Sequence, residues 1–377
     1  MDATKDRLSE LQPIQVFDPK QENEQYLKFR IPNLIITERD TLLLAWEMRK
    51  DINTDEGDTE LTVRRSTDGG KSFETVLTVD SGDKPLTNPV MIVDKEGTIH
   101  LLYACAVGNE GVYHCFSTKE QDGRAWSEPT NIVSSLKKEE LGWTMCNPGP
   151  GHGICVQNGA YAGRLIAPIW CYTGTYEVFT VYSDDNGKNW NLGDRASKNL
   201  DETSIAELSD GNIMLNSRQF SVGYTVTGEW AKAYSKPKDE TESYRYITVS
   251  KTGIGDWCET YLHTALPQPA LQGGMCTTVL TDQNGNQKNV LLFVNCKTQI
   301  GFKRLTVSGS LDDGKTWPYE LVINEDAGGY ADIGVDSKGR VYVLYEMLYP
   351  DRVWLKLVSF DAGELFAKEQ LLFIKEL

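Results

Sequence analysis

The chain has 377 residues, with 38 lysines and arginines against 54 aspartates and glutamates, which gives a formal net charge of −16. Its 40% hydrophobic and 24% charged residues are typical of a globular protein and exclude wholesale disorder. So acidic a chain is a poor match for nucleic acid or an anionic membrane, because both need a basic face. No apolar run approaches the ~18 residues of a membrane span, so we expect no transmembrane segment.

The start of the chain and its cysteines bear on the compartment. Residues 1–7 contain no apolar stretch of the signal-peptide type. We expect a cytoplasmic protein if the chain is complete as written, and a periplasmic or secreted one if a signal peptide was removed. Eight scattered cysteines without a Cys-x-x-Cys pair favour buried free thiols over a disulfide framework. Four histidines without ligand spacing predict no metal site, and we expect no cofactor.

A short pattern, Ser-x-Asp-x-Gly-x-x-aromatic, recurs along the chain at residues 66–73, 183–190 and 310–317. Two degenerate copies begin at Ser117 and Ser250. The pattern predicts a hairpin corner. The Asp bonds amides of its own turn, the Gly supplies a positive φ, and the aromatic side chain packs beneath the loop.

Strand-like segments rich in β-branched and aromatic residues surround these corners, and they are expected at 98–104, 164–172, 178–182, 244–249, 290–294 and 340–345. A short helix is expected near 362–370. Because a four-stranded blade takes about 40–70 residues, the spacing predicts an all-β fold. We expect a single six-bladed β-propeller domain over residues 1–377, with 1–25 as a lead-in or closing strand.

The repeats are Asp boxes, and three further segments make the chain resemble the exo-sialidases (neuraminidases) of the bacterial and animal type. These segments are Phe29-Arg30-Ile31-Pro32, residues 147–154 with 163–168, and residues 202–218. Their order and spacing match the family from about Arg30 to Glu346. An Asp box alone also occurs in non-catalytic propellers, whereas the ordered combination is specific.

The resemblance implies that arginines from different blades hold the carboxylate of sialic acid, which requires planar bidentate donors. Arg30 corresponds to the first of them and Arg218 to the second. Phe302 stands where the family has its third arginine, and Arg304 lies two residues further on. We take Arg304 as the candidate, brought into place by a bulge, with Lys303 or an incomplete triad as the alternatives.

The resemblance also implies a tyrosine nucleophile. A carboxylate nucleophile would be repelled by the carboxylate of the substrate, whereas a neutral tyrosine with a neighbouring base is not. Tyr330 matches the tyrosine of the family, and Glu202, 16 residues before Arg218, matches its base. Asp55 is the expected acid for the leaving oxygen, with Asp51 as the alternative, and neighbouring carboxylates should raise its pKa.

Further contacts follow by the same resemblance. Arg49 is expected near the 4-hydroxyl of the sugar, and Glu346 is expected to orient the first arginine. Asn88 and Gln272 occupy places that contact substrate in the family. Three aromatic residues are expected to line a pocket for an N-acyl group: Trp143, Trp170 and Tyr172.

The function expected is that of a retaining exo-α-sialidase that acts through a tyrosyl-enzyme intermediate. Its partners would be sialylated glycoproteins, glycolipids and oligosaccharides. Two alternatives keep the fold and the site: a glycosidase for another ulosonic acid of the Kdn or Kdo type, and a trans-sialidase. A third alternative, from another class, is a non-catalytic carbohydrate-binding propeller.

Overall fold

The computed structural model describes residues 13–14, 16–17, 25–50, 57–82, 84–219, 243–282, 284–366 and 371–372. Regular structure in these residues is almost entirely β-strand, which confirms the predicted all-β fold. The helical segments are short: α3 (Lys138–Leu141), α4 (Ala362–Leu365), η1 (Ala106–Gly108), η2 (Val133–Leu136) and η3 (Gly159–Tyr161). The helix expected near 362–370 is present as α4, with Asp361 as its N-cap; residues 367–370 lie outside the described residues.

The strands form four sheets whose neighbours in sequence pair antiparallel. The largest sheet contains, in spatial order, β25 (Leu371–Leu372), β19 (Gly274–Asp282), β20 (Gln287–Cys296), β21 (Lys303–Ser310), β22 (Tyr319–Val335), β23 (Arg340–Tyr349), β24 (Arg352–Asp361), β1 (Lys28–Ile36), β2 (Leu42–Arg49), β3 (Thr59–Ser66) and β4 (Glu74–Val79). The second contains β5 (Leu86–Val93), β6 (Ile99–Cys105), β7 (Gly111–Ser117) and β8 (Thr130–Asn131).

The third sheet contains β10 (Ile154–Cys155), β11 (Leu165–Tyr172), β12 (Tyr176–Ser183) and β13 (Asn191–Leu192), with β9 (Met145–Pro148) and β14 (Ser197–Lys198) at its sides. The fourth contains β15 (Thr203–Glu207), β16 (Ile213–Ser217), β17 (Tyr244–Ser250) and β18 (Tyr261–Pro267). All six strands predicted from the sequence are present, with ends that differ by a few residues.

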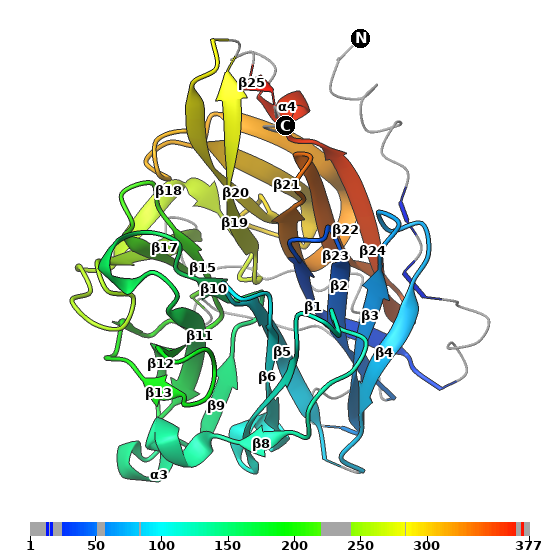
Figure 1. Cartoon of the computed structure of the whole chain (residues 1–377), viewed down its shortest axis with the longest axis vertical. Helices are drawn as coiled ribbons and strands as arrows, with labels where there is room; N and C mark the ends of the chain where they lie inside the picture. Colours follow the sequence, from blue (N-terminus) through cyan, green and yellow to red (C-terminus); the bar gives the residue numbers. More distant parts are fainter. Residues whose placement is uncertain are drawn as a thin grey trace.

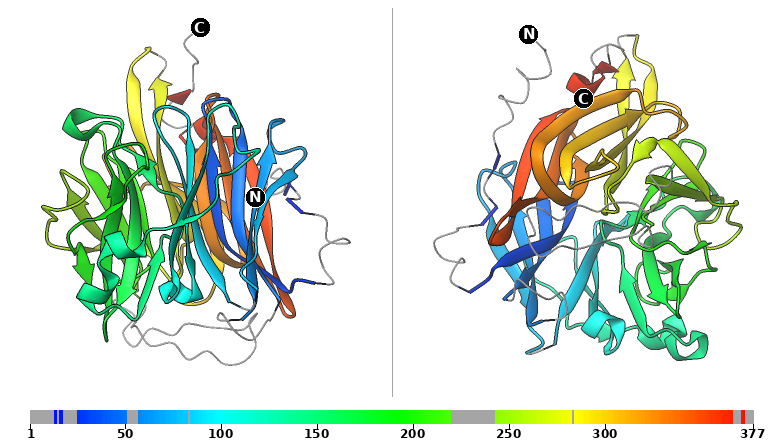
Figure 2. Two further views of the ribbon diagram at one scale, coloured as in Figure 1. Left: turned by 60° about the horizontal axis from the view of Figure 1, so that its bottom comes forward. Right: turned by 180° about the vertical axis from the view of Figure 1, so that it is seen from behind.

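The sheets follow one another around the molecule in chain order, so that the last strands lie beside the first (Figure 1). Seen from the side, they pack face to face (Figure 2). Closure joins the two ends of the chain: Lys28 of β1 pairs with Val353 of β24, and Ile14 bridges Leu357 of β24. The cyclic order places the first strand of each antiparallel group near the centre.

The core lies between neighbouring sheets. One buried cluster joins Ile166 and Val178 of the third sheet to Ile205 and Leu215 of the fourth, and equivalent clusters join the others. Burial of each such side chain contributes about 1.5–3 kcal/mol, so the sheet-to-sheet contacts dominate the stability of the ring. All eight cysteines are unpaired; seven are buried and Cys258 is exposed.

The strand β22 passes from one antiparallel group to the next. Its first half pairs with β21 and its second half with β23, and the register shifts between Gly328 and Ala331. This shift interrupts the ladder at Tyr330. The strand therefore carries Tyr330 at the point where it changes partners.

The predicted hairpin corners have the expected hydrogen bonds. In the third complete copy, Asp312 accepts from the backbone N–H and the hydroxyl of Thr316 at 2.9 and 2.7 Å, and Gly314 N–H donates to Ser310 Oγ at 2.8 Å. Gly314 has φ +78°, and Trp317 is buried beneath the corner. The copies at 66–73 and 183–190 repeat these bonds.

Candidate active site

Tyr330 lies at the centre of a cluster of buried charged side chains. Its hydroxyl donates to Glu202 Oε1 at 2.7 Å and accepts from Arg218 Nη1 at 2.7 Å. The guanidinium of Arg30 lies over the ring, 5.1 Å from its centroid. Burial raises the pKa of Tyr330 well above its usual range, although the charge of Arg218 acts in the opposite direction.

Glu202 directly precedes β15 and is 6% exposed. Its second carboxylate oxygen, Oε2, lies 2.7 Å from Arg218 Nη1. Burial raises the pKa of Glu202 to about 7; the charge of Arg218 opposes this rise and that of Asp201 adds to it. A carboxyl of this kind is suited to take a proton from a neighbouring hydroxyl near neutral pH.

Arg218 directly follows β16 and is held in a fixed orientation. Asp201 accepts from its Nε at 2.9 Å and from its Nη2 at 2.8 Å. Although burial acts to lower it, the pKa of Arg218 is raised well above its usual range by the carboxylates of Asp201 and Glu202. The guanidinium therefore remains charged next to Tyr330.

Arg30 is anchored by Glu346, as the sequence analysis expected. Glu346 Oε1 accepts from Arg30 Nε at 2.7 Å and from the N–H of Ile31 at 2.9 Å, and Oε2 accepts from the N–H of Tyr330 at 3.1 Å. One carboxylate thus holds the strands of both Arg30 and Tyr330. Gly329 makes room for it, because a Cβ there would overlap the Glu346 carboxylate.

Arg49 and Asn88 meet at a second buried carboxylate, Glu47, which no motif indicated. Glu47 Oε2 accepts from Arg49 Nε at 2.7 Å, and Oε1 accepts from the N–H of Asn88 at 2.8 Å. The Asn88 amide donates to the carbonyl of Pro148 at 2.9 Å. Burial raises the pKa of Glu47. The only sequence signal for Glu47 is its position two residues before Arg49, on the same face of β2.

Gln272 contacts β22 at the residue after Tyr330. Its Oε1 accepts from the N–H of Ala331 at 3.2 Å, and the side chain is completely buried. Its Nε2 has no hydrogen-bond partner among the described residues. Like Glu47, Asp201 was missed by the sequence analysis, although it immediately precedes Glu202.

Arg304 does not join this cluster. It lies on β21 at a register shift with φ +56°, so the bulge that the sequence analysis invoked is present. The bulge directs the side chain elsewhere: it is 41% exposed and lies 3.9 Å from Glu320. Lys303, the alternative, is also exposed.

The candidate acid Asp55 and its alternative Asp51 belong to residues 51–56, which lie outside the described residues.

The three aromatic residues expected at an N-acyl pocket separate into two groups. Trp143 is buried in the core against Phe179, 5.1 Å between ring centroids. Trp170 and Tyr172 are half-buried and contact Tyr176, at 5.8 and 5.0 Å. Burial raises the pKa of Tyr176, and the charge of Asp201 adds to this rise, so the aromatic group lies within electrostatic reach of the charged cluster.

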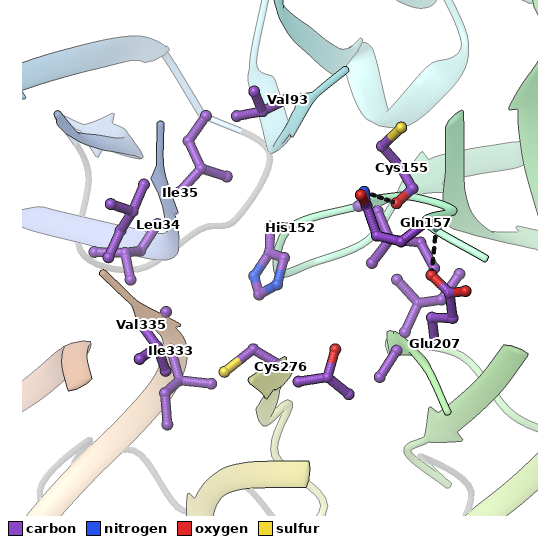
Figure 3. Close-up of a pocket in the computed structure, with 17 residues that line it drawn as sticks. Leu34, Ile35, Val93, His152, Cys155, Gln157, Glu207, Cys276, Ile333 and Val335 are labelled. Carbon is purple, nitrogen blue, oxygen red and sulfur yellow. Dashed lines mark hydrogen bonds between the residues drawn. The ribbon is translucent and has the colours of Figure 1, made fainter. Parts of the chain in front are cut away.

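A cavity of about 290 Å³ lies at the opposite end of the central strands (Figure 3). Ile36 lines the cavity at the end of β1, whereas Arg30 lies near the start of that strand. Val335 lines it at the end of β22, beyond Tyr330 on the same strand. His152 projects into the cavity (Figure 3), and its Nδ1 lies 2.9 Å from Asp332 Oδ1. This cavity is therefore separate from the charged cluster.

No helix in the described part of the chain is long and apolar enough to cross a membrane. Those same residues contain no group of three or more His, Cys, Asp or Glu side chains that could hold a metal ion.

The chain is similar to known proteins along most of its length. Residues 40–354 match the family described as BNR repeat-like domain. The chain is 29% identical over 346 residues to a sialidase of Micromonospora viridifaciens, covering 86% of this chain and 50% of that protein. It is 27% identical over 351 residues to a sialidase of Bacteroides fragilis, covering 84% and 60%. The chain thus spans half to three-fifths of the length of these relatives.

Solved structures share the fold. A Hadza microbial sialidase superposes with a TM-score of 0.74 at 25% identity, covering 91% of this chain and 67% of that one. The intramolecular trans-sialidase from Ruminococcus gnavus gives 0.75 at 17% identity, covering 93% and 98%. Fold and repeats together define a β-propeller-type protein with BNR repeats. Within that class, the chain belongs to the sialidase family.

Proposed function

We propose that this chain is a glycoside hydrolase, a retaining exo-α-sialidase built on a six-bladed β-propeller. The observation that carries the proposal is the contact of the Tyr330 hydroxyl with both Glu202 and Arg218. A binding protein has no need of a tyrosine hydroxyl on a buried carboxyl. Six blades correspond to β1–β4, β5–β8, β9–β14, β15–β18, β19 to the first half of β22, and the second half of β22 to β24.

The substrate carboxylate would bind to Arg30 and Arg218. Both guanidiniums are oriented by carboxylates, Glu346 and Asp201, so little side-chain entropy is lost when a ligand binds. Arg49 and Asn88, held by Glu47, would contact the hydroxyls of the sugar. The half-buried group of Trp170, Tyr172 and Tyr176 would contact an N-acyl substituent.

The first chemical step would form a bond between the Tyr330 oxygen and the anomeric carbon. Glu202 takes the hydroxyl proton, and the bond to the leaving oxygen breaks as Asp55 protonates that oxygen. Because the pKa of Tyr330 is raised well above its usual range and that of Glu202 is about 7, transfer of the proton from Tyr330 to Glu202 is unfavourable in the resting site. The proton therefore stays on Tyr330 until the substrate's anomeric carbon accepts the oxygen's electron pair.

The second step would reverse the roles. Asp55, now a carboxylate, takes a proton from water as the water oxygen attacks the anomeric carbon. The bond to Tyr330 breaks, and Glu202 returns the proton to the phenolate. Two inversions at the same carbon give net retention, with free α-sialic acid as the first product.

Hydrolysis of a fluorogenic N-acetylneuraminic acid α-glycoside by the wild type and by Tyr330→Phe tests the proposal. The phenylalanine keeps the ring under Arg30 and leaves the Glu202–Arg218 ion pair in place, so the fold should be unchanged. We expect kcat to fall by about 10³-fold or more, as for removal of a covalent nucleophile. A variant with near-wild-type rate would disprove the mechanism.

A second candidate function, intramolecular transfer, is favoured by structural neighbours. Two of them are named as intramolecular trans-sialidases, one of which was solved with 2,7-anhydro-Neu5Ac. Proton NMR of the products separates the two: α-sialic acid indicates hydrolysis and the 2,7-anhydro sugar indicates transfer. If neither forms, deaminated and Kdo-type glycosides are the next substrates to test, followed by direct sugar binding.

A further inference from the structure

A fourth buried arginine, Arg245, lies beneath the charged cluster and is absent from the mechanism above. It belongs to β17, next to β16, and its side chain is completely buried. Its Nε donates to Asn216 Oδ1 at 2.6 Å and its Nη2 to the carbonyl of Asn216 at 2.6 Å. Its Nη1 donates to the carbonyl of Leu271 at 2.9 Å and reaches Gln268 Oε1 at 3.3 Å.

These contacts connect Arg245 to the site through the backbone. Asn216 is two residues before Arg218, and Leu271 is the residue before Gln272. The guanidinium therefore lies between the strand that delivers Arg218 and the segment that delivers Gln272. The pKa of Arg245 falls to about 9, mainly through burial and then through the positive charge of Arg218.

Every hydrogen-bond acceptor of Arg245 is neutral. A buried charge without an opposite charge in contact is costly, and proteins usually pair it. The other three arginines of the cluster each contact a carboxylate: Glu346 for Arg30, Glu47 for Arg49, and Asp201 with Glu202 for Arg218. Among the described arginines of the cluster, Arg245 is the one whose charge is not cancelled by contact.

The balance of buried charges in the cluster changes with Arg245. Without Arg245, the described part of the cluster has one more carboxylate than arginine: Arg30, Arg49 and Arg218 against Glu47, Asp201, Glu202 and Glu346. When all four carboxylates are ionised, an anionic ligand would then enter a site with a net negative charge. With Arg245 the numbers are equal, and the positive charge that it adds lies beside the strand that leads to Arg218.

We propose that Arg245 supplies, without touching the ligand, the positive charge that lets this site bind a carboxylate sugar, a charge that Arg304 is not placed to give. The inference rests on the proposed function, because it takes an α-carboxylate as the ligand's distinguishing group. Arg245 is thus a positioning and electrostatic residue, and the structure separates those two roles.

The separation comes from Asn216. Its Oδ1 accepts from Arg245, whereas its Nδ2 has no hydrogen-bond partner among the described residues. Asn216→Asp therefore keeps every hydrogen bond, is nearly the same size, and places a carboxylate against Arg245. It cancels the charge and retains the geometry. Arg245→Lys, measured in mildly acidic buffer where a buried ammonium stays protonated, does the opposite, because it retains the charge and loses the planar hydrogen bonds.

The experiment measures binding by calorimetry of two ligands: the 2,3-dehydro glycal of N-acetylneuraminic acid, and its uncharged methyl ester. The dissociation constant of the methyl ester divided by that of the charged glycal measures how much the ligand's charge favours binding. We expect Asn216→Asp to reduce that ratio by about ten-fold, as for one charge acting over roughly 10 Å at an effective dielectric constant of ~20. The methyl ester should bind equally well to both proteins.

Arg245→Lys should weaken the two ligands together and leave their ratio near the wild-type value. If the Arg245→Lys variant fails to fold, the Asn216→Asp variant still tests the inference, because it removes no hydrogen bond. Thermal unfolding verifies that this variant is folded. An unchanged ratio in Asn216→Asp overturns the inference alone. A wild type that binds neither ligand overturns the proposed function and this inference with it.

Discussion

Glu346→Gln is the most informative single change to the site, because one carboxylate holds two of its strands. The carboxylate of Glu346 accepts from Arg30, Ile31 and Tyr330, and its side chain is 1% exposed. A glutamine has one acceptor oxygen, so at least one of these donors would face its NH₂ group. The change also removes the carboxylate that forms an ion pair with the buried Arg30.

The magnitude follows from these contacts. Breaking a buried ion pair by removing one partner costs about 3–5 kcal/mol, so the free energy of unfolding should fall by roughly 3 kcal/mol. A lost hydrogen bond to a charged group costs about 1.5–3 kcal/mol, which corresponds to a 10- to 100-fold fall in kcat/KM. The loss should appear in KM through Arg30 and in kcat through Tyr330.

Glu207→Gln is the matched control. Glu207 is also a buried glutamate, and it accepts from the backbone N–H groups of Gln157 and Asn158 at 2.6 and 2.9 Å. It lies at the far end of β15, beside the cavity of Figure 3. We expect it to lose about 1 kcal/mol of stability and to keep the wild-type kcat/KM. Urea unfolding and hydrolysis of the fluorogenic α-sialoside measure both. The reasoning fails if Glu346→Gln stays within three-fold of wild type, or if both variants lose activity equally.

Three further predictions concern single side chains. Glu202 binds its proton more tightly in the folded protein than in the unfolded chain, so the stability that it contributes is present below about pH 4.5 and is lost as the pH rises to about 7. Glu202→Gln should remove this decline of the melting temperature with pH. An unchanged dependence of the melting temperature on pH would show the pKa assignment to be wrong. Gly329→Ala should lower kcat by at least about ten-fold, because the added Cβ would displace the Glu346 carboxylate. Gly142→Ala, where open space surrounds the added Cβ, is the control and should keep the wild-type kcat. Asp312→Asn should cost about 1–2 kcal/mol in urea unfolding without changing kcat/KM, because it weakens only the bonds of its corner; a change in kcat/KM would contradict a purely structural role.

The repeating corners and the alternating strands could be predicted because both are local. The Asp, Gly and aromatic residue of a corner act within eight residues, as the bonds from Asp312 to Thr316 show. The all-β fold follows from the strands between such corners. The resemblance to sialidases, carried by the ordered motifs, also led to four residues that the structure brings together. They are Tyr330 on β22, Arg30 on β1, Glu202 directly before β15 and Arg218 directly after β16.

Glu47, Asp201 and Arg245 could not be predicted, because their roles depend on burial and on contacts with other strands and segments. A glutamate two residues before an arginine is common in any exposed strand. Only the packing of β2 against β5 buries Glu47 against both Arg49 and Asn88. Arg304 shows the reverse case. Its type and position suit a carboxylate, but a positive φ at the bulge turns the side chain toward Glu320.

The sequence by itself thus determined the strands, the corners and the residues that the proposed chemistry requires. The tertiary structure alone decided which charges are buried together and which of them are cancelled. The physical reason is that a pattern along the chain records neighbours within a strand or turn. Desolvation and charge pairing depend instead on residues up to 316 positions apart, as between Arg30 and Glu346.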